Sequence, residues 1–240
     1  MFFDRYDAGQ RLAQRLAPYK DSNAIVYALP RGGVVLGYEI ATALNLKLDI
    51  VITRKIGHPL DKEVAVCAIT EYGELVCDEQ GLCGIDESWI EAEVHTEQKE
   101  AHRRRSVYST RKRPLSARGK IAIVVDDGIA TGLTIKAAIR ALQKQHPRKV
   151  VAAVPICPPE VWSELEVLTD ETIVLIDDEH YLGSVGAYYE NFPQLSDAEV
   201  VSLLTKADKL YKKRRESVRL TVSDCKVRTR LGPTPRLGYV

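Results

Sequence analysis

The chain lacks the long hydrophobic runs of membrane proteins. Its longest apolar stretches are short, such as the one from Val150 to Ile156, far below the roughly 18 residues that a membrane-spanning helix needs. Net charge is also scarce, because 34 Lys and Arg against 33 Asp and Glu leave a formal net charge of only +1. Composition therefore gives no reason to expect a protein that coats membranes or nucleic acid. The N-terminus carries Asp4, Arg5 and Asp7 where a signal peptide would need apolar residues, so we expect a cytoplasmic protein.

Cysteine is sparse as well. The five cysteines are odd in number and scattered along the chain: Cys67, Cys77, Cys83, Cys157 and Cys225. This pattern favours free thiols in a reducing compartment over a disulfide framework. Cys77 and Cys83 are the closest pair, but they form no CxxC motif and no suitably spaced histidine accompanies them, so we do not expect a zinc site.

What the 240 residues do contain is enough apolar side chain for a proper core, at 45% hydrophobic residues. Apolar and β-branched runs predict strands, and apolar residues at spacings of three and four predict helices. Strands are expected over 23–29, 48–53, 63–70, 74–77, 121–125, 149–156 and 171–176, and helices over 5–18, 36–44, 86–113, 135–142, 159–168 and from 196 onward. This alternation predicts an α/β domain with a parallel sheet and helices on both of its faces.

Two segments stand apart from that alternation. Residues 86–113 form a long polar helix, acidic at its start and basic at its end, which complements a helix macrodipole. We favour a solvated connecting helix here over a ligand-binding arm, and we assign 78–118 to a helical insertion in a domain that spans 1–205. The tail, 206–240, has 11 Lys or Arg and 3 Asp or Glu, a local charge of +8 against −7 for the rest, and we expect it to be flexible or loosely docked.

Three of the loops that follow strands carry chemically useful residues, and in a parallel sheet ligands bind at such loops. In the first, Gly32 and Gly33 allow close approach of the backbone, and Arg31 offers a forked donor for phosphate. The second, 53–59, contains the adjacent cations Arg54 and Lys55, which by themselves are equally consistent with ordinary surface charge.

The third loop is the most informative. A buried strand, 121–125, delivers Asp126 and Asp127 to its carboxyl end, and a helix begins soon afterwards with Thr131 and Thr134 near its start. Helix N-terminal amides and these hydroxyls predict a phosphate site. Two carboxylates beside that site would repel a phosphate unless they face another part of the ligand, and the hydroxyls of a ribose 5-phosphate satisfy this requirement.

These residues resemble the type I phosphoribosyltransferases, whose signature for phosphoribosyl pyrophosphate (PRPP) is an apolar strand, two acids, a short loop and a Thr-Gly-x-Thr turn. The resemblance implies a type I phosphoribosyltransferase fold and assigns PRPP binding to Gly128, Ile129, Ala130, Thr131, Gly132 and Thr134. Gly128 departs from the family pattern, in which an aliphatic residue or serine is usual. The resemblance also places the pyrophosphate on Arg31, Gly32 and Gly33, a loop that in the family often contains a non-proline cis peptide bond.

Within the family, the segments 53–59 and 70–73 look most like the mobile loop of adenine phosphoribosyltransferases. Ala130 points the same way, because enzymes for hypoxanthine and guanine usually have an aspartate there. The opening 3–9 and the segment 185–192 look closer to a group of uncharacterised bacterial proteins that are called phosphoribosyltransferases by domain only.

The resemblance also implies a mechanism. PRPP would bind with Mg²⁺, held mainly by substrate oxygens and water rather than directly by protein ligands. Attack on the ribose C1 by a ring nitrogen of a purine-like base passes through an oxocarbenium-like state. The catalytic Asp126 and Asp127 would oppose its positive charge, while the catalytic Arg54 and Lys55, together with Arg31, would neutralise the departing pyrophosphate.

The acceptor side is less defined. Glu71 is the best candidate for a catalytic residue that handles the proton of the acceptor, and a solvated turn glutamate is an equally good interpretation. A hood after the last strand, residues 177–195, would supply the acceptor pocket, and its aromatic residues either stack on a base or close a small satellite core: Tyr181, Tyr188, Tyr189 and Phe192.

Two other functions remain open at this point. A regulator that senses PRPP or a nucleotide through the same site, and reaches nucleic acid through the basic tail, is the main alternative to a transferase. A phosphatase-like or receiver-like Mg²⁺ site at Asp126 and Asp127 ranks last, because the usual third acid is missing. We also expect a homodimer.

Overall fold

The computed structural model describes residues 1–109, 111, 113–177 and 181–228. Its centre is a five-stranded parallel sheet with the strand order β2-β1-β6-β7-β8. The strands are β1 (Ala24–Ala28), β2 (Lys47–Ile50), β6 (Ile121–Val125), β7 (Lys149–Cys157) and β8 (Glu171–Asp177). Strands β1 and β6 are buried along their whole length, as expected for strands covered on both faces of a parallel sheet.

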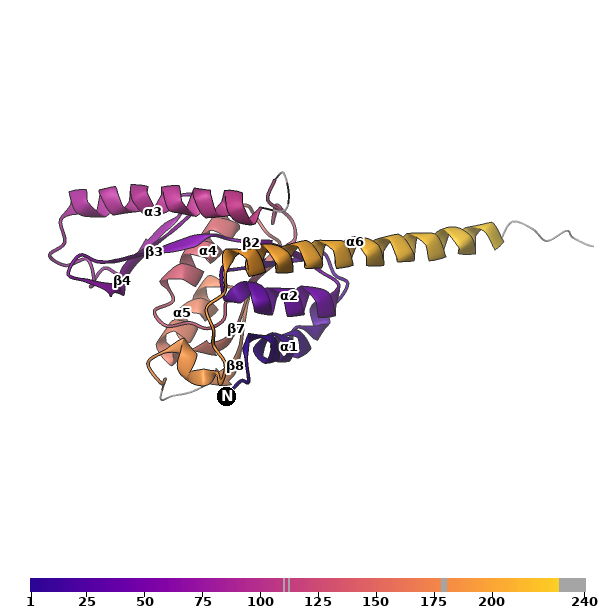
Figure 1. The fold of residues 1–240 in the computed structure, drawn as a ribbon, viewed down its shortest axis with the longest axis horizontal. Helices are drawn as coiled ribbons and strands as arrows, with labels where there is room; N and C mark the ends of the chain where they lie inside the picture. The colour runs from indigo at the N-terminus through magenta and orange to yellow at the C-terminus, as the bar shows by residue number, and fades with distance from the viewer. Residues whose placement is uncertain (110, 112, 178–180, 229–240) are drawn as a thin grey trace, which may run out of the picture.

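Helices cover both faces of this sheet (Figure 1). Alternate residues of each strand enter two separate cores, so that Val26 and Ile123 point to one face and Ile25 and Val124 to the other. The first face packs against α1 (Arg5–Arg15), α2 (Gly33–Leu44) and the start of α6 (Asp197–Arg228), and the second against α4 (Leu133–Gln143) and α5 (Pro159–Leu168). The predicted α/β fold with helices on both faces is therefore confirmed.

A second, antiparallel sheet of three strands projects from the first. It consists of β3 (Thr53–His58), β4 (Asp61–Thr70) and β5 (Leu75–Cys77), in that order. The prediction of a loop over 53–59 is wrong for this reason: β3 pairs with β4 along its length, and its Ile56 is buried. A six-residue strand with only one buried side chain carries too little hydrophobic alternation to be recognised in the sequence.

The insertion helix α3 (Glu87–Tyr108) lies along this small sheet (Figure 1). Trp89, Ile90 and Val94 pack against the buried face of β4, and Ala101 and Tyr108 are fully buried. The Tyr108 hydroxyl donates to Asp197 Oδ1 at 2.6 Å, which fastens the end of α3 to the start of α6. The expected solvated connecting helix is thus a packed element, and it ends five residues earlier than the expected boundary at 113.

The prediction that all cysteines are free thiols is wrong for two of them. Cys67 on β4 and Cys77 on β5 form a disulfide. They are direct partners in the antiparallel ladder, with their Cα atoms 4.0 Å apart. They are ten positions apart in the sequence, and the strand pairing brings them together. Cys83 and Cys157 are free thiols, but the disulfide weakens the argument for a reducing compartment.

The tail, 206–240, was expected to be flexible or loosely docked. The flexible alternative is wrong over 206–228, because α6 continues to Arg228, and the remainder, 229–240, lies outside the described residues. The helix begins after a capping box in which Ser196 and Glu199 exchange hydrogen bonds. The first part of α6 packs on the domain through four buried residues: Val200, Leu203, Leu204 and Ala207. Residues 212–217 are exposed, and the helix extends beyond the rest of the domain (Figure 1). Lys and Arg are good helix formers, so the helix outlasts its apolar pattern. Among the described helices, none is long and apolar enough to cross a membrane.

Candidate functional site

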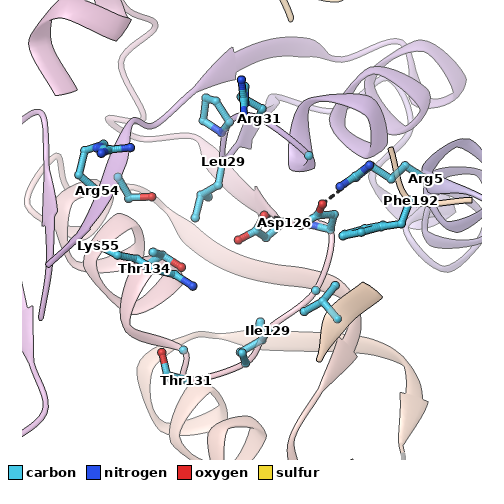
Figure 2. A pocket seen from close by; sticks show the side chains of 18 of the residues that line it. Arg5, Leu29, Arg31, Arg54, Lys55, Asp126, Ile129, Thr131, Thr134 and Phe192 are labelled. Atoms are coloured by element: carbon cyan, nitrogen blue, oxygen red, sulfur yellow. Dashed lines mark hydrogen bonds and ion pairs between the residues drawn. The ribbon is translucent and has the colours of Figure 1, made fainter. Parts of the chain in front are cut away.

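The carboxyl ends of β1 and β6, together with β3 and α3, surround a cavity of about 440 Å³ (Figure 2). Most of the residues predicted to bind or transform the ligand line it: Arg31, Gly32, Arg54, Lys55, Asp126, Asp127, Gly128, Ile129, Ala130, Thr131, Gly132 and Thr134. The three segments with predicted ligand-binding residues therefore meet at one cavity, as the order of β1 and β6 in the sheet leads one to expect. Gly33 lies beneath this lining, at the start of α2.

The loop after β6 has the form of an anion site. Gly132 caps α4 with a left-handed backbone at φ 75°, and Leu133 begins the helix. Thr134 is half-buried in the first turn and Thr131 is exposed just before it. The Ile129 amide donates to Ile156 O at 2.9 Å and ties the loop to the end of β7. The amides at the start of α4, with the positive end of the helix dipole, belong to the segment through Thr131, Gly132 and Thr134 that lines the cavity.

The two aspartates lie at the floor of the cavity. Burial, and then the charge of Asp127, raise the pKa of Asp126 well above its ordinary value of 3.8, which the nearby Lys55 only partly offsets. Asp126 Oδ1 also accepts a hydrogen bond from the Asp127 amide at 2.9 Å. Burial beside a second carboxyl therefore holds Asp126 toward its neutral form.

Close packing explains why the first loop has glycine at positions 32 and 33. A Cβ atom on Gly32 would lie 1.7 Å from Asp127 Oδ2, and one on Gly33 would lie 2.8 Å from Val125 O. The carboxyl end of β6 thus packs directly on this loop, where any larger residue would displace the aspartates. The peptide bond between Pro30 and Arg31 is cis, the feature that the family resemblance implied for this loop.

Asp127 is held by residues that come from far away in the sequence. Arg5, on α1, donates from Nε to Asp127 Oδ2 at 2.7 Å (Figure 2). Its Nη1 donates to Pro193 O at 2.7 Å. Its guanidinium also lies over the ring of Phe192, 3.6 Å from the centroid. The Tyr189 hydroxyl donates to Asp127 O at 2.6 Å. The hood and the first helix therefore meet at this one aspartate.

Acidic residues of α3 pair with the cations on the opposite wall. Arg54 donates to Glu97 at 2.6 Å, and Arg104 donates to Glu100 at 2.9 Å. The hydrogen bonds from Arg103 and Arg104 lower the pKa of Glu100 to about 2, so that it stays ionised. Lys55 is exposed beside them. The insertion helix thus contributes Arg104 to the lining and orients Arg54.

Glu71, predicted to act on the acceptor, is not among the residues that line the cavity. It is buried, and both of its carboxylate oxygens accept from Arg105 of α3, at 2.5 and 2.7 Å. Arg105 also donates to Asp49 and to Ile50 O. Neither interpretation of the sequence anticipated this, since Glu71 is neither a solvated turn residue nor a group that faces the cavity. It joins α3 to β2.

The predicted tyrosines of the acceptor pocket also lie elsewhere. Tyr188 and Tyr189 are buried in the core with Phe2, and Tyr181 stacks on Tyr188 with centroids 5.8 Å apart. None of the three lines the cavity, which agrees with the satellite-core alternative. The aromatic residue of the hood that does line it is Phe192.

Sequence reasoning missed Arg5, Leu29, Arg104 and Val185 as lining residues. Arg5 belongs to the opening segment 3–9, which carries part of the family resemblance, and Arg104 belongs to the basic end of α3. The sequence therefore draws attention to both residues, but it gives no reason to place either of them at the ligand site. Val185 approaches the loop so closely that a Cβ on Gly128 would lie 2.4 Å from it. This contact explains the glycine that departs from the family pattern.

Comparison with known proteins decides the family. The sequence model of the phosphoribosyl transferase domain matches residues 4–167, more than half of the chain. The chain belongs to the phosphoribosyl transferase family. Two Mycobacterium tuberculosis relatives, from strains CDC 1551 and H37Rv and each named a candidate phosphoribosyl transferase, are 38% identical over 209 residues. The match covers 86% of this phosphoribosyl transferase chain and 47% of each relative, so the chain spans about half the length of these relatives.

A solved structure supports the same family assignment. A Thermus thermophilus protein of known crystal structure is 37% identical to this phosphoribosyl transferase chain, with a TM-score of 0.69. The similarity covers 85% of this chain and 98% of that one. The domain architecture is therefore shared along almost the whole of the Thermus protein.

Proposed function

We propose that this protein transfers the ribose 5-phosphate of PRPP to a ring nitrogen of a purine-like base and releases pyrophosphate. The observation that carries the proposal is the cavity itself, in which a helix N-terminus and two carboxylates face a wall of cations. This arrangement fits a ligand with a phosphate at one end, hydroxyls in the middle and a more highly charged group at the other end.

Each part of PRPP has a complementary set of groups. The amides at the start of α4, with Thr131 and Thr134, suit the 5-phosphate. Asp126 and Asp127 suit the adjacent ribose hydroxyls, which donate hydrogen bonds to carboxylate oxygens. Arg31, Arg54, Lys55 and Arg104 line the remaining side and suit the pyrophosphate.

The donor set also fits Mg²⁺. This ion keeps several waters and would be held mainly by substrate oxygens, those of the pyrophosphate and the ribose hydroxyls, with Asp126 and Asp127 nearby rather than as direct ligands. Bound there, Mg²⁺ supplies positive charge to the pyrophosphate oxygens.

The residues divide the charge that develops during transfer. Bond breaking at the ribose C1 leaves positive charge on the sugar and negative charge on the departing pyrophosphate. Asp126 and Asp127 stabilise the first, and Arg54, Lys55 and Arg104 stabilise the second. Because Arg54 and Arg104 are already oriented by Glu97 and Glu100, little reorganisation is needed when the leaving group becomes charged.

An apolar side of the cavity supports a flat acceptor. Leu29, Ile129, Val185 and Phe192 line it. Phe192, rather than the tyrosines, is the proposed aromatic contact for the base. Because the Arg5 guanidinium lies over its ring and the Tyr189 ring packs on it with centroids 4.8 Å apart, the proposed contact is made by the ring edge. Glu71 has no proposed role in proton transfer because Arg105 occupies both of its oxygens.

The test is binding and turnover with defined ligands. We expect Mg-PRPP at about 100 times its Kd to stabilise the protein by about 2.7 kcal/mol, a rise in Tm of about 5–10 °C for a chain of this size. Adenine, hypoxanthine, guanine, uracil and non-nucleobase acceptors are then assayed for release of pyrophosphate. No thermal shift with Mg-PRPP would reject the proposal, and binding without turnover for any acceptor would favour a PRPP-sensing regulator.

A substitution separates the site from the fold. We expect Asp127→Asn to abolish turnover and to leave the circular dichroism spectrum unchanged. The matched control is Glu164→Gln, an exposed carboxylate on α5 that pairs with Lys136, which we expect to keep full activity. Normal turnover in Asp127→Asn would contradict the role assigned to Asp127.

A further inference from the structure

We propose that Arg5 is a positioning residue that holds Asp127 in its working orientation and lowers the negative charge of the cavity floor. This inference rests on the proposed function. Arg5 begins α1, 122 positions away from Asp127 in the sequence, and its side chain is only 10% exposed. It nevertheless lines the cavity.

The contacts of Arg5 fix its direction. Its Nε donates to Asp127 Oδ2, its Nη1 donates to Pro193 O, and its flat face lies on Phe192. Three contacts from three directions leave the guanidinium little freedom, and Arg loses less entropy in such an arrangement than a flexible ammonium group would. Arg5 is therefore a rigid support between the hood and the carboxylate.

Asp127 is fixed on its other sides too. Its carbonyl accepts from the Tyr189 hydroxyl, and its carboxylate lies against the α-carbon of Gly32. Because Arg5 takes Oδ2, the second oxygen, Oδ1, is the one that a ribose hydroxyl would use. Arg5 thus selects which carboxylate oxygen serves the ligand.

The charge balance gives Arg5 a second effect. Two adjacent carboxylates lie next to the proposed position of a strongly anionic ligand, and like charges that close repel both each other and the ligand. Within the described part of the chain, the ion pairs made to these two carboxylates come from Arg5 alone. Lys55 acts on Asp126 through its field but makes no such pair. Removal of Arg5 would leave the floor more negative by one charge.

The experiment is isothermal titration of the full chain with Mg-PRPP. We expect Arg5→Gln to weaken binding at least tenfold and Arg5→Lys, which keeps the charge, to stay within threefold of the parent. The control is Arg11→Gln, on the same helix, where an exposed arginine pairs with Asp7, and we expect it to stay within twofold. In an Asp127→Asn background, Arg5→Gln should weaken binding by less than threefold, because its partner charge is gone.

A second variant tests the charge within one folded protein. Arg5→His carries an imidazolium near pH 5.5 and loses this charge as the pH rises past the ordinary histidine pKa of about 6.5, at a higher pH where Asp127 stabilises the imidazolium. Relative to the parent at the same pH, we expect Mg-PRPP to bind this variant at least fivefold more weakly once the imidazolium has lost its proton.

Three results would overturn the inference. The first is parental affinity in Arg5→Gln, and the second is equal weakening in Arg5→Lys and Arg5→Gln, which would show that the positive charge at position 5 contributes nothing to binding. The third is an Arg5→His affinity, relative to the parent, that does not change with pH. If the parent itself fails to bind Mg-PRPP, the proposed function fails and the inference fails with it, and this result differs from the others because it appears before any substitution.

Discussion

The buried Arg105 of the insertion helix allows a quantitative prediction about stability. Its side chain is 14% exposed, and it pairs with Glu71, which is 3% exposed, and with Asp49. Arg105→Met keeps much of the apolar stem but leaves two buried carboxylates without their cation. Removal of one partner of a buried ion pair costs about 3–5 kcal/mol, mostly because the remaining charge is buried without compensation. We therefore expect Arg105→Met to lower the free energy of unfolding by that amount at pH 7.

The measurement is urea denaturation followed by tryptophan fluorescence. Trp89 lies on α3 and Trp162 on α5, so a Trp162→Phe background leaves Trp89 as the reporter of the insertion helix. The control is Arg103→Met, on the same helix, whose side chain is 58% exposed and pairs with Glu100, and we expect no resolvable change in the urea midpoint.

A double substitution separates charge from packing. Because Glu71→Gln removes one of the two uncompensated carboxylates, we expect it to recover part of the stability that Arg105→Met loses. The reasoning is refuted if Arg105→Met costs less than about 1 kcal/mol, since the ion pairs would then contribute no more than surface pairs do. It is also refuted if the two substitutions are strictly additive.

Two further predictions concern the cavity. The pKa of Asp126 is higher in the folded chain than its ordinary value of 3.8. Above pH 3.8 the unfolded chain loses this proton more readily than the folded chain, so the group lowers the free energy of unfolding increasingly as the pH rises toward the pKa of the folded state. Asp126→Asn should therefore stabilise the protein at pH 7–8, with a gain that disappears as the pH falls toward 3.8, and a Tm difference that is independent of pH would contradict this. Gly128→Ala should weaken Mg-PRPP binding because its Cβ would meet Val185 at 2.4 Å, and Val185→Ala should restore part of the affinity, as titration calorimetry can show.

The sequence predicted the central sheet and the loop after β6 well because both are local features. A strand buried on both faces reads as an apolar run, and Asp126, Asp127 and Thr131 follow such a run directly. Parallel pairing then brings the carboxyl ends of β1 and β6 together whatever the rest of the chain does. The small sheet was recognised only in part, because exposed strands such as β3 lack a clear hydrophobic alternation.

The residues that were misjudged depend on contacts between distant segments. Arg105 reaches Glu71 across 34 positions, and nothing in the neighbourhood of either residue indicates the pairing. Tyr188 and Tyr189 were open to two interpretations, because an aromatic ring buries apolar area equally well under a base or in a core. In this fold Phe2 covers Tyr189, with ring centroids 5.4 Å apart, and the core interpretation applies.

The charge of the cavity wall cannot be judged from the sequence alone, because residues of a distant helix pair with its cations. Counted along the sequence, Arg54 and Lys55 form a cationic cluster that a pyrophosphate would find strongly attractive. In the fold, Glu97 and Glu100 of α3 pair with Arg54 and Arg104, so the field of that wall is weaker than the count of cations suggests. We therefore expect the affinity for an anion at this wall to depend on the insertion helix as well as on the strand that carries Arg54 and Lys55. The sequence predicts a connecting helix for this segment, but in the fold α3 changes how much positive charge is available at the proposed pyrophosphate end of the site.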